Sequence, residues 1–263
     1  MTPPARMSWM PPPANPLATR QRLLAVWGLA WIAGFVDGAG YLALVGVYTS
    51  HMTGNTAALG HFLSVRDWRE VAAHGWPLVA FLAGLMVGAT LMEIGRRGRH
   101  HSRLSLVLGV EIVLLALLAA LDPRGSAATL GWLWLPAAAM GMQTVTITKV
   151  GDQRVYSTYM TGSLSKFAEA VTGYGFWLAD RIRSGRPGWP REALRHNLLG
   201  HTIVTGGLWL LFLIGGFSGA VAESAWGLHA LWWPVLGLGL LAWLDRLHPI
   251  SPVHAGEKLG FEG

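Results

Sequence analysis

Two isolated acids lie inside apolar runs of this sequence, where they could carry ions or protons. Asp37 is the only charge in residues 23–47, and Glu111 lies about a third of the way into residues 104–121. A charge within hydrocarbon costs on the order of 3 kcal/mol or more, so such a residue usually has a function or a partner. Asp37 could take a proton or cation, or could hold a bent helix through freed backbone donors. Glu111 is either a coupling site or half of a packing salt bridge.

An eight-residue segment recurs 108 positions along the chain. Residues 47–54 read VYTSHMTG and residues 155–162 read VYSTYMTG, so five positions are identical and two are Thr/Ser exchanges. Each copy follows one apolar run and precedes two more, so the repeated unit holds three spans. An odd number of spans turns the second copy upside down in the membrane, which is an inverted-topology repeat.

The two copies are predicted to border a shared path for a substrate or ion, because such paths commonly run between inverted repeats. A helix that begins at each Met-Thr-Gly would offer free N–H groups to an anion or a polar group. Alternatively, the threonines only cap short interfacial helices, and the glycines allow a close turn. Aligning Gly34 with Gly141 adds Gln143 to the candidates. The predicted path residues are Asp37, Tyr48, His51, Thr53, Gly54, Asn55, Glu111, Gln143, Tyr159, Thr161, Gly162 and Ser163.

The elements that position these residues are expected to be membrane spans. Of the 263 residues, 52% are hydrophobic and 13% are charged, against about 25% charged in an ordinary soluble domain. This composition excludes a soluble enzyme. The expected fold is an all-α integral membrane protein with six transmembrane helices in two inverted three-helix repeats, each with a Met-Thr-Gly re-entrant or interfacial half-helix. The predicted spans are 23–47, 71–94, 104–121, 130–148, 198–218 and 226–244. Within them, Gly34 with Gly38 and Gly84 with Gly88 place small residues on one helix face, which predicts close helix packing.

The distribution of basic residues predicts the orientation. With the amino terminus in the cytoplasm and six spans, 17 of the 20 Lys and Arg residues fall in cytoplasmic segments, as the positive-inside rule requires. Residues 155–179, which contain a predicted ion pair of Lys166 with Glu169, must then enter the membrane without crossing it. Both termini are expected in the cytoplasm.

The predicted organisation is one membrane domain between two tails. Residues 1–19 hold six of the 14 prolines and are expected to be a disordered cytoplasmic tail. Residues 20–248 form the membrane domain, with repeats at about 20–122 and 128–248, and residues 249–263 form a second cytoplasmic tail.

Catalytic, metal and cofactor sites are not expected. The absence of cysteine excludes thiolate chemistry and disulfides, and His196 and His201 would lie on different helix faces. Residues 216–219 read GFSG, as in rhomboid intramembrane proteases, with His229 in the next span, but Ser218 is expected to close a span at the outer surface. Ser163 and Lys166 have the spacing of a penicillin-binding serine and lysine without the companion motifs. The net charge of +6 follows from basic cytoplasmic loops, so nucleic-acid binding is not expected.

Three segments resemble the YoaK family of bacterial inner-membrane proteins, a domain of unknown function. They are GFVDGA at 34–39, YLAL at 41–44 and HMTGN at 51–55, and the resemblance covers about residues 20–245. It implies a six-helix cytoplasmic-membrane protein, often described as a permease, without an established substrate. Ser163 departs from the pattern, because the first copy has Asn55 there.

The expected function is that of a secondary transporter or permease for a small polar or charged solute. Asp37 and Glu111 would couple ions, with protons as candidates, and no Gly-Lys-Ser/Thr phosphate loop is present for ATP hydrolysis. The alternative is a membrane scaffold or sensor without a path, and an intramembrane serine hydrolase is a distant third. The expected partners are the lipid bilayer, the solute and, as an open alternative, further copies of the chain.

Overall fold

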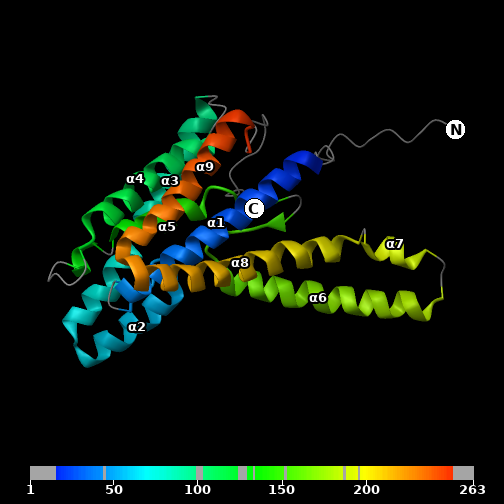
Figure 1. Ribbon diagram of the computed structural model, residues 1–263. Helices are drawn as coiled ribbons and strands as arrows, with labels where there is room; N and C mark the ends of the chain where they lie inside the picture. Colours follow the sequence, from blue (N-terminus) through cyan, green and yellow to red (C-terminus); the bar gives the residue numbers. More distant parts are fainter. Residues whose placement is uncertain are drawn as a thin grey trace.

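The computed structural model describes residues 16–43, 46–98, 103–123, 129–132, 134–150, 153–185, 188–194 and 196–250. These ranges are almost entirely helical, with one short antiparallel hairpin (Figure 1). The elements are α1 (Pro16–Ala43), α2 (Met52–Val65), α3 (Trp68–Arg97), α4 (Arg103–Leu121), η1 (Thr129–Trp132), α5 (Trp134–Thr144), β1 (Lys149–Val150), β2 (Gln153–Arg154), α6 (Met160–Arg183), α7 (Trp189–Leu194), α8 (Asn197–Trp226), η2 (Gly227–Leu231) and α9 (Trp232–Leu247).

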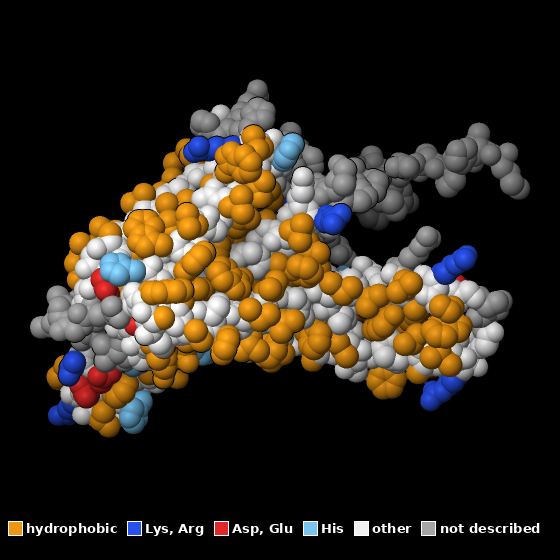
Figure 2. Space-filling model, in the orientation of Figure 1, with side chains coloured by type: hydrophobic (Ala, Val, Ile, Leu, Met, Phe, Trp, Pro, Cys, Tyr) orange, Lys and Arg blue, Asp and Glu red, His pale blue; other side chains and the backbone are white. Residues whose placement is uncertain are grey.

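Four helical stretches of the described chain are long and apolar enough to cross a membrane. They are Thr19–Ala43, Trp68–Arg97, Arg103–Leu121 and Asn197–Leu247, and the last contains both α8 and α9. Hydrophobic side chains cover most of the face shown in Figure 2, and the few Lys and Arg side chains visible there lie along its periphery. These features confirm the prediction of an all-α membrane protein. The amphipathic helix α6 is not among the four stretches.

The span predicted at 130–148 is much shorter in the structure. Helix α5 has 11 residues, which at 1.5 Å per residue cover about 16 Å of a hydrocarbon layer roughly 30 Å thick. The β-branched run 144–148 disfavours continuation of the helix. Thr146 instead forms a tight turn, in which its N–H and its hydroxyl both donate to the Gln143 carbonyl, at 3.1 and 2.7 Å.

Two other predicted boundaries also differ. Helix α1 begins at Pro16, so residues 16–19, which were expected in the tail, are helical; proline suits a first helical position, where its missing N–H has no partner to lose. Helix α8 continues to Trp226, so Ser218 lies inside this helix and does not close a span. Residues 1–15 of the predicted first tail and 251–263 of the second lie outside the described residues.

Glycines allow α1 to cross α8 at very close range. A Cβ atom added at Gly34 would collide with the Phe212 carbonyl, and one added at Gly38 with the Gly216 carbonyl. From the other helix, a Cβ at Gly215 would collide with the Trp31 carbonyl. The prediction that the small residues of α1 serve close helix packing is therefore confirmed.

Helix α3 crosses α5 in the same way. A Cβ atom at Gly84 would collide with the Ala138 carbonyl, and one at Gly141 with the Phe81 carbonyl. The prediction that the small residues of α3 also serve packing is therefore confirmed. In both crossings a helix that precedes one copy of the repeated segment packs its glycine against a phenylalanine carbonyl.

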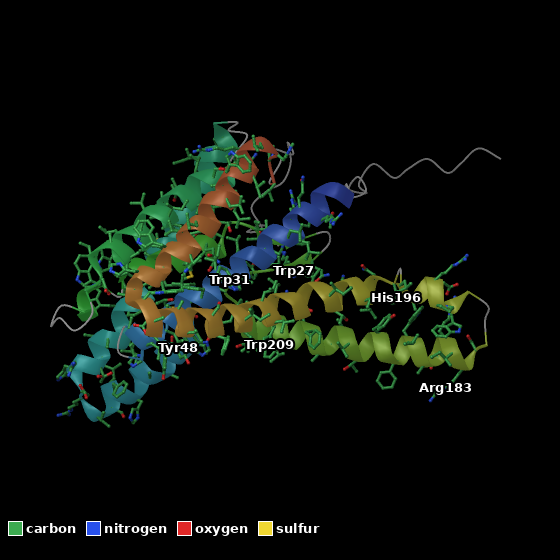
Figure 3. The ribbon with its side chains drawn as sticks, viewed as in Figure 1. Trp27, Trp31, Tyr48, Arg183, His196 and Trp209 are labelled. Atoms are coloured by element: carbon green, nitrogen blue, oxygen red, sulfur yellow. The ribbon has the colours of Figure 1, made fainter. Side chains whose placement is uncertain are left out.

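The second copy leads into a helical hairpin that extends from the rest of the molecule. After α7 at the far end, the first part of α8 runs back along α6 (Figure 1). The Tyr174 hydroxyl donates to the Ala193 carbonyl at 3.1 Å, and the rings of Trp177 and His196 lie 4.1 Å apart. Arg183 and His196 lie toward this outer end (Figure 3). Lys166 donates to the Arg154 carbonyl at 2.8 Å in place of the predicted ion pair with Glu169.

Candidate functional site

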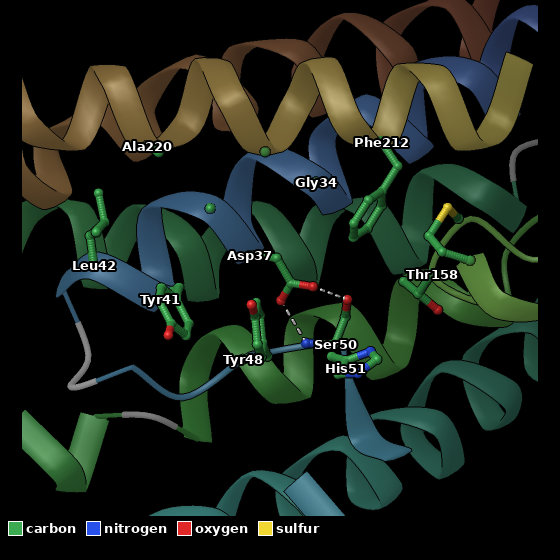
Figure 4. Close-up of a pocket in the computed structure, with 13 residues that line it drawn as sticks. Gly34, Asp37, Tyr41, Leu42, Tyr48, Ser50, His51, Thr158, Phe212 and Ala220 are labelled. Carbon is green, nitrogen blue, oxygen red and sulfur yellow. Dashed lines mark hydrogen bonds between the residues drawn. The ribbon is translucent and has the colours of Figure 1, made fainter. Parts of the chain in front are cut away.

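The candidate site is built around Asp37 and the non-helical segment before α2. Asp37 Oδ1 accepts hydrogen bonds from the Thr49 N–H (2.9 Å), the Thr49 hydroxyl (2.6 Å) and the Ser50 N–H (2.8 Å). Asp37 Oδ2 accepts one from the Ser50 hydroxyl at 2.5 Å (Figure 4). Asp37 is only 4% exposed. The Asp37 side chain therefore fastens the non-helical segment between α1 and α2. All four groups that donate hydrogen bonds to it are neutral.

The second copy has a neutral counterpart of this arrangement. The hydroxyls of Thr144 and Thr158 lie 2.7 Å apart, where the first copy has Asp37 and Ser50. Beside them, Gln143 Nε2 donates to the Leu29 carbonyl at 2.9 Å and to the Ser157 hydroxyl at 3.0 Å. Gln143, a predicted path residue, is fully buried and serves to join α5 to α1 and to the second copy.

The Met-Thr-Gly segments begin two helices in an unusual way. The N-cap residues of α2 and α6 are His51 and Tyr159, and neither side chain makes a capping hydrogen bond. Each ring instead packs against the glycine in the first turn of its own helix. A Cβ atom at Gly54 would collide with the His51 ring, and one at Gly162 would collide with the Tyr159 ring. The glycine of each motif is thus required by the preceding ring. The alternative that Thr53 and Thr161 are the N-caps is wrong, since both lie inside the first turn.

Asn55 and Ser163 fasten these helices to the segments before them. Asn55 Nδ2 donates to the Tyr48 carbonyl at 2.8 Å, and Asn55 is 1% exposed. The Ser163 hydroxyl donates to the Tyr159 carbonyl at 3.0 Å, and Ser163 is 6% exposed. The structure therefore places both predicted path residues inside the protein, with internal partners.

A cavity of about 380 Å³ lies beside Asp37, between α1, α8 and the two repeated segments (Figure 4). The first copy contributes Tyr48, Ser50 and His51, and the second contributes Thr158 and Met160. Segments more than 100 residues apart thus meet at one pocket. The remaining lining residues are Gly34, Asp37, Gly38, Tyr41, Leu42, Phe212, Gly216 and Ala220.

Only three of the predicted path residues line this pocket: Asp37, Tyr48 and His51. Ser50, Thr158, Met160 and Phe212 were missed. Ser50 and Thr158 could have been found as equivalent positions of the repeat, whereas Phe212 enters only through the crossing of α1 with α8. A second cavity, of about 440 Å³, is bordered by Trp226, His229 and Trp233 and lacks both the acid and the repeated segments.

Aromatic rings form one side of the pocket. Tyr41 and Tyr48 stack with their centroids 4.6 Å apart, and the His51 ring meets Tyr48 edge-on at 5.4 Å. Partial burial, with the nearby Tyr41 and Asp37, raises the pKa of the Tyr48 phenol above its usual value. Tyr48 therefore keeps its proton at neutral pH and presents an uncharged ring.

Glu111 does not belong to this pocket. It is fully buried in α4, and neither carboxylate oxygen has a hydrogen-bond partner among the described residues. The packing salt bridge considered for it is not formed in that part of the chain. A buried polar group without a hydrogen-bond partner lowers the free energy of unfolding by about 1 to 3 kcal/mol.

We expect Glu111→Leu to raise the midpoint of thermal unfolding in detergent relative to Glu111→Gln, because leucine fills similar space without unpartnered oxygens. If Glu111 couples ions, the same leucine variant loses transport while its fold gains stability. If the leucine variant is less stable than the glutamine variant, the Glu111 side chain must have a hydrogen-bond partner, and the prediction is wrong.

A third buried acid, Asp245, has a structural role that was not predicted. Asp245 Oδ2 accepts from the Ser105 N–H at 3.1 Å and from the Ser105 hydroxyl at 2.9 Å. Asp245 Oδ1 accepts from the Ile250 N–H at 2.9 Å. These bonds fasten the end of α9 to the first turn of α4. The only sign in the sequence is an acid at the end of the last apolar run.

The two catalytic patterns do not assemble in the structure. The Ser218 hydroxyl donates to the Gly215 carbonyl at 2.9 Å within α8, while His229 Nδ1 lies 2.8 Å from the Ala119 carbonyl. Among the described residues there is no group of three or more His, Cys, Asp or Glu that could hold a metal ion. His196 is the N-cap of α8 and accepts the Leu198 N–H at 3.3 Å.

Comparison with known proteins places the sequence of this chain in a family. The model of the family "Protein of unknown function (DUF1275)" matches residues 25–244. The chain is 26% identical over 224 residues to the UPF0700 transmembrane protein YoaK of Bacillus subtilis (strain 168), an alignment that covers 83% of this chain and 91% of the relative. No solved structure matches the chain.

Proposed function

Because this chain belongs to the DUF1275 family of proteins of unknown function, we propose its activity from its geometry: it is a secondary transporter or permease for a small polar or charged solute. The observation that carries the proposal is the pocket at Asp37, which both copies of the repeated segment line. In inverted-repeat transporters the substrate site lies at the interface of the repeats, beside interrupted helices. Asp37 would bind the solute or a coupling proton, and Glu111 would serve as a second proton site.

The proposal includes six membrane crossings, arranged as two inverted repeats. Helices α1 to α4 would form the first repeat, and α5, α6, α8 and α9 the second. The two glycine crossings support it, because the contact of Gly34 with the Phe212 carbonyl recurs as that of Gly141 with the Phe81 carbonyl. In each case the first helix of one repeat packs on the second spanning helix of the other.

We place the chain in the cytoplasmic membrane of a bacterium, with both termini inside. Basic residues support this orientation. Arg96 and Arg97 end α3, Arg246 ends α9, and Arg181 and Arg183 end α6. These helix ends would face the cytoplasm under the positive-inside rule.

Cysteine labelling tests for a path through the pocket. The chain has no cysteine, so His51→Cys and Met160→Cys each introduce a single thiol, one from each copy. We expect both to react with a membrane-impermeant maleimide in intact cells and also in inside-out vesicles, because a transporter opens its site alternately to the two sides. Asn55 and Ser163 are poorer positions, since both are buried.

Val113→Cys is the matched control. Val113 is 63% exposed on α4 in an apolar stretch, so its thiol would face lipid and stay unreactive toward a charged reagent. If the His51 and Met160 thiols each react from one side only under every condition, the transport proposal fails. The pocket would then belong to a scaffold or sensor.

A further inference from the structure

The pocket contains the buried carboxyl group of Asp37, which has no Lys or Arg partner among the described residues. Asp37 is its only carboxylate, and no Lys or Arg is among the described residues that line it. The four hydrogen bonds to Asp37 come from two N–H groups and two hydroxyls, all of them neutral. A buried carboxyl group without a cationic partner either takes up a proton or attracts a cation from outside. Hydrogen bonds from the Thr49 and Ser50 N–H groups favour the ionised form of Asp37, which leaves the position of the opposite charge to a ligand.

The Asp37 carboxylate retains room for one more donor. Its Oδ1 accepts three hydrogen bonds, but its Oδ2 accepts only the one from Ser50. A carboxylate oxygen has two lone pairs. A cationic N–H or C–H group of a ligand could thus reach Oδ2 while the segment before α2 stays fastened.

The walls of the pocket suit an organic cation better than a metal ion. Tyr41, Tyr48 and Phe212 contribute aromatic rings, and the faces of such rings attract ammonium groups. A metal ion would find a single carboxylate and mostly apolar walls. The volume of about 380 Å³ is near the lower end of the range for small-molecule sites, so the ligand is small.

The two helix N-termini beside the pocket do not favour an anion. Each is covered by a ring, that of His51 on α2 and that of Tyr159 on α6, and the motif glycines make room for both rings. The sequence alone suggested these N-termini as anion sites. In the structure the charged group that lines the cavity is the carboxyl of Asp37, an acid, which does not suit an anion.

We propose that this pocket binds a small organic ammonium ion, with its charge at Asp37 Oδ2 and its apolar part against Tyr41, Tyr48 and Phe212. The inference rests on the proposed function, for which it names the substrate class.

Choline and its neutral isostere 3,3-dimethylbutan-1-ol test the proposal, because they share shape and hydroxyl and differ in charge. Binding is measured to the purified full chain in detergent, by calorimetry and by the shift in unfolding temperature. We expect choline to bind about tenfold or more tightly than the isostere. Asp37→Asn should abolish this preference. Its amide keeps one oxygen for Thr49, and the Ser50 hydroxyl can rotate to accept from the amide nitrogen.

A second pair of variants keeps the test decisive if Asp37→Asn fails to fold. Met160 lines the pocket from the second copy. Met160→Lys would place a tethered ammonium group there and should prevent choline binding, whereas the neutral Met160→Gln should preserve it. Equal loss in the lysine and glutamine variants would overturn the proposal.

The result separates this inference from the transport proposal. Equal binding of choline and the isostere, or no binding of choline, would overturn the cation site and leave the labelling result to decide transport. Choline binding that depends on Asp37, combined with one-sided labelling, would uphold the cation site and reject transport. The pocket would then be the ligand site of a sensor.

Discussion

Gly34→Val is expected to destabilise the fold by about 3 kcal/mol or more, the largest effect of any single substitution we consider. The added side chain would meet the Phe212 carbonyl and the backbone of Gly216. Flexible side chains can move away from such a collision, but helix backbone cannot. The α1–α8 crossing would have to separate, which would also open the pocket. The measurement is thermal unfolding of the purified protein in detergent, with size-exclusion chromatography to detect misfolding.

Gly28→Val is the matched control on the same helix. A Cβ atom at Gly28 would lie 3.7 Å from the nearest atom, the Leu241 Cδ1, which is an ordinary contact. Both variants change helix propensity in the same way, so the difference between them isolates the backbone collision. Gly141→Val should behave like Gly34→Val, because it meets the Phe81 carbonyl in the equivalent crossing. Similar stability of the Gly34 and Gly28 variants would contradict the close crossing.

Asp37→Ala is expected to have the second largest effect, a loss of about 3 kcal/mol or more in stability. The substitution leaves four donors of Thr49 and Ser50 without an acceptor, in residues that are 1% and 7% exposed. The segment between α1 and α2 would have to rearrange to let water reach these groups. Thermal unfolding measures the loss, and limited proteolysis near residues 48–51 reports the local opening.

Asp37→Asn is the control that separates charge from hydrogen bonding. It retains an oxygen for the Thr49 and Ser50 donors, so we expect it to keep most of the stability that Asp37→Ala loses. If both variants are as stable as the unsubstituted protein, the hydrogen bonds seen at Asp37 do not hold the segment. If both lose the same large amount of stability, the charge itself is essential to the fold.

These two expectations bear on what Asp37 is for. An acid inside a membrane span was predicted to act in binding or to hold a bent helix, and its geometry allows both. Oδ1 accepts three hydrogen bonds from the segment that it fastens, while Oδ2 accepts only one, and Asp37 lines the pocket. A residue that shapes a site and also supplies its charge should therefore be tested with paired variants.

The sequence by itself determined the features that depend on local pattern. Long apolar runs with few charges can only be stable in lipid as helices that satisfy their own backbone groups, so the membrane class followed from composition. The repeated segment was visible as identical residues at a fixed offset. Glycines spaced four apart predicted close helix packing, because they share one helix face whatever that face meets.

Only the tertiary structure decided which of these residues form the pocket and what partners they have. Phe212 and Gly216 line the pocket with Asp37 because α1 crosses α8, and Thr158 of the second copy lines it with Ser50 of the first. No local pattern encodes such a long-range arrangement. The short α5 and the rings of His51 and Tyr159 over their helices were likewise unforeseen. Backbone geometry and the space left by neighbours set these features, and both arise only when distant segments pack together.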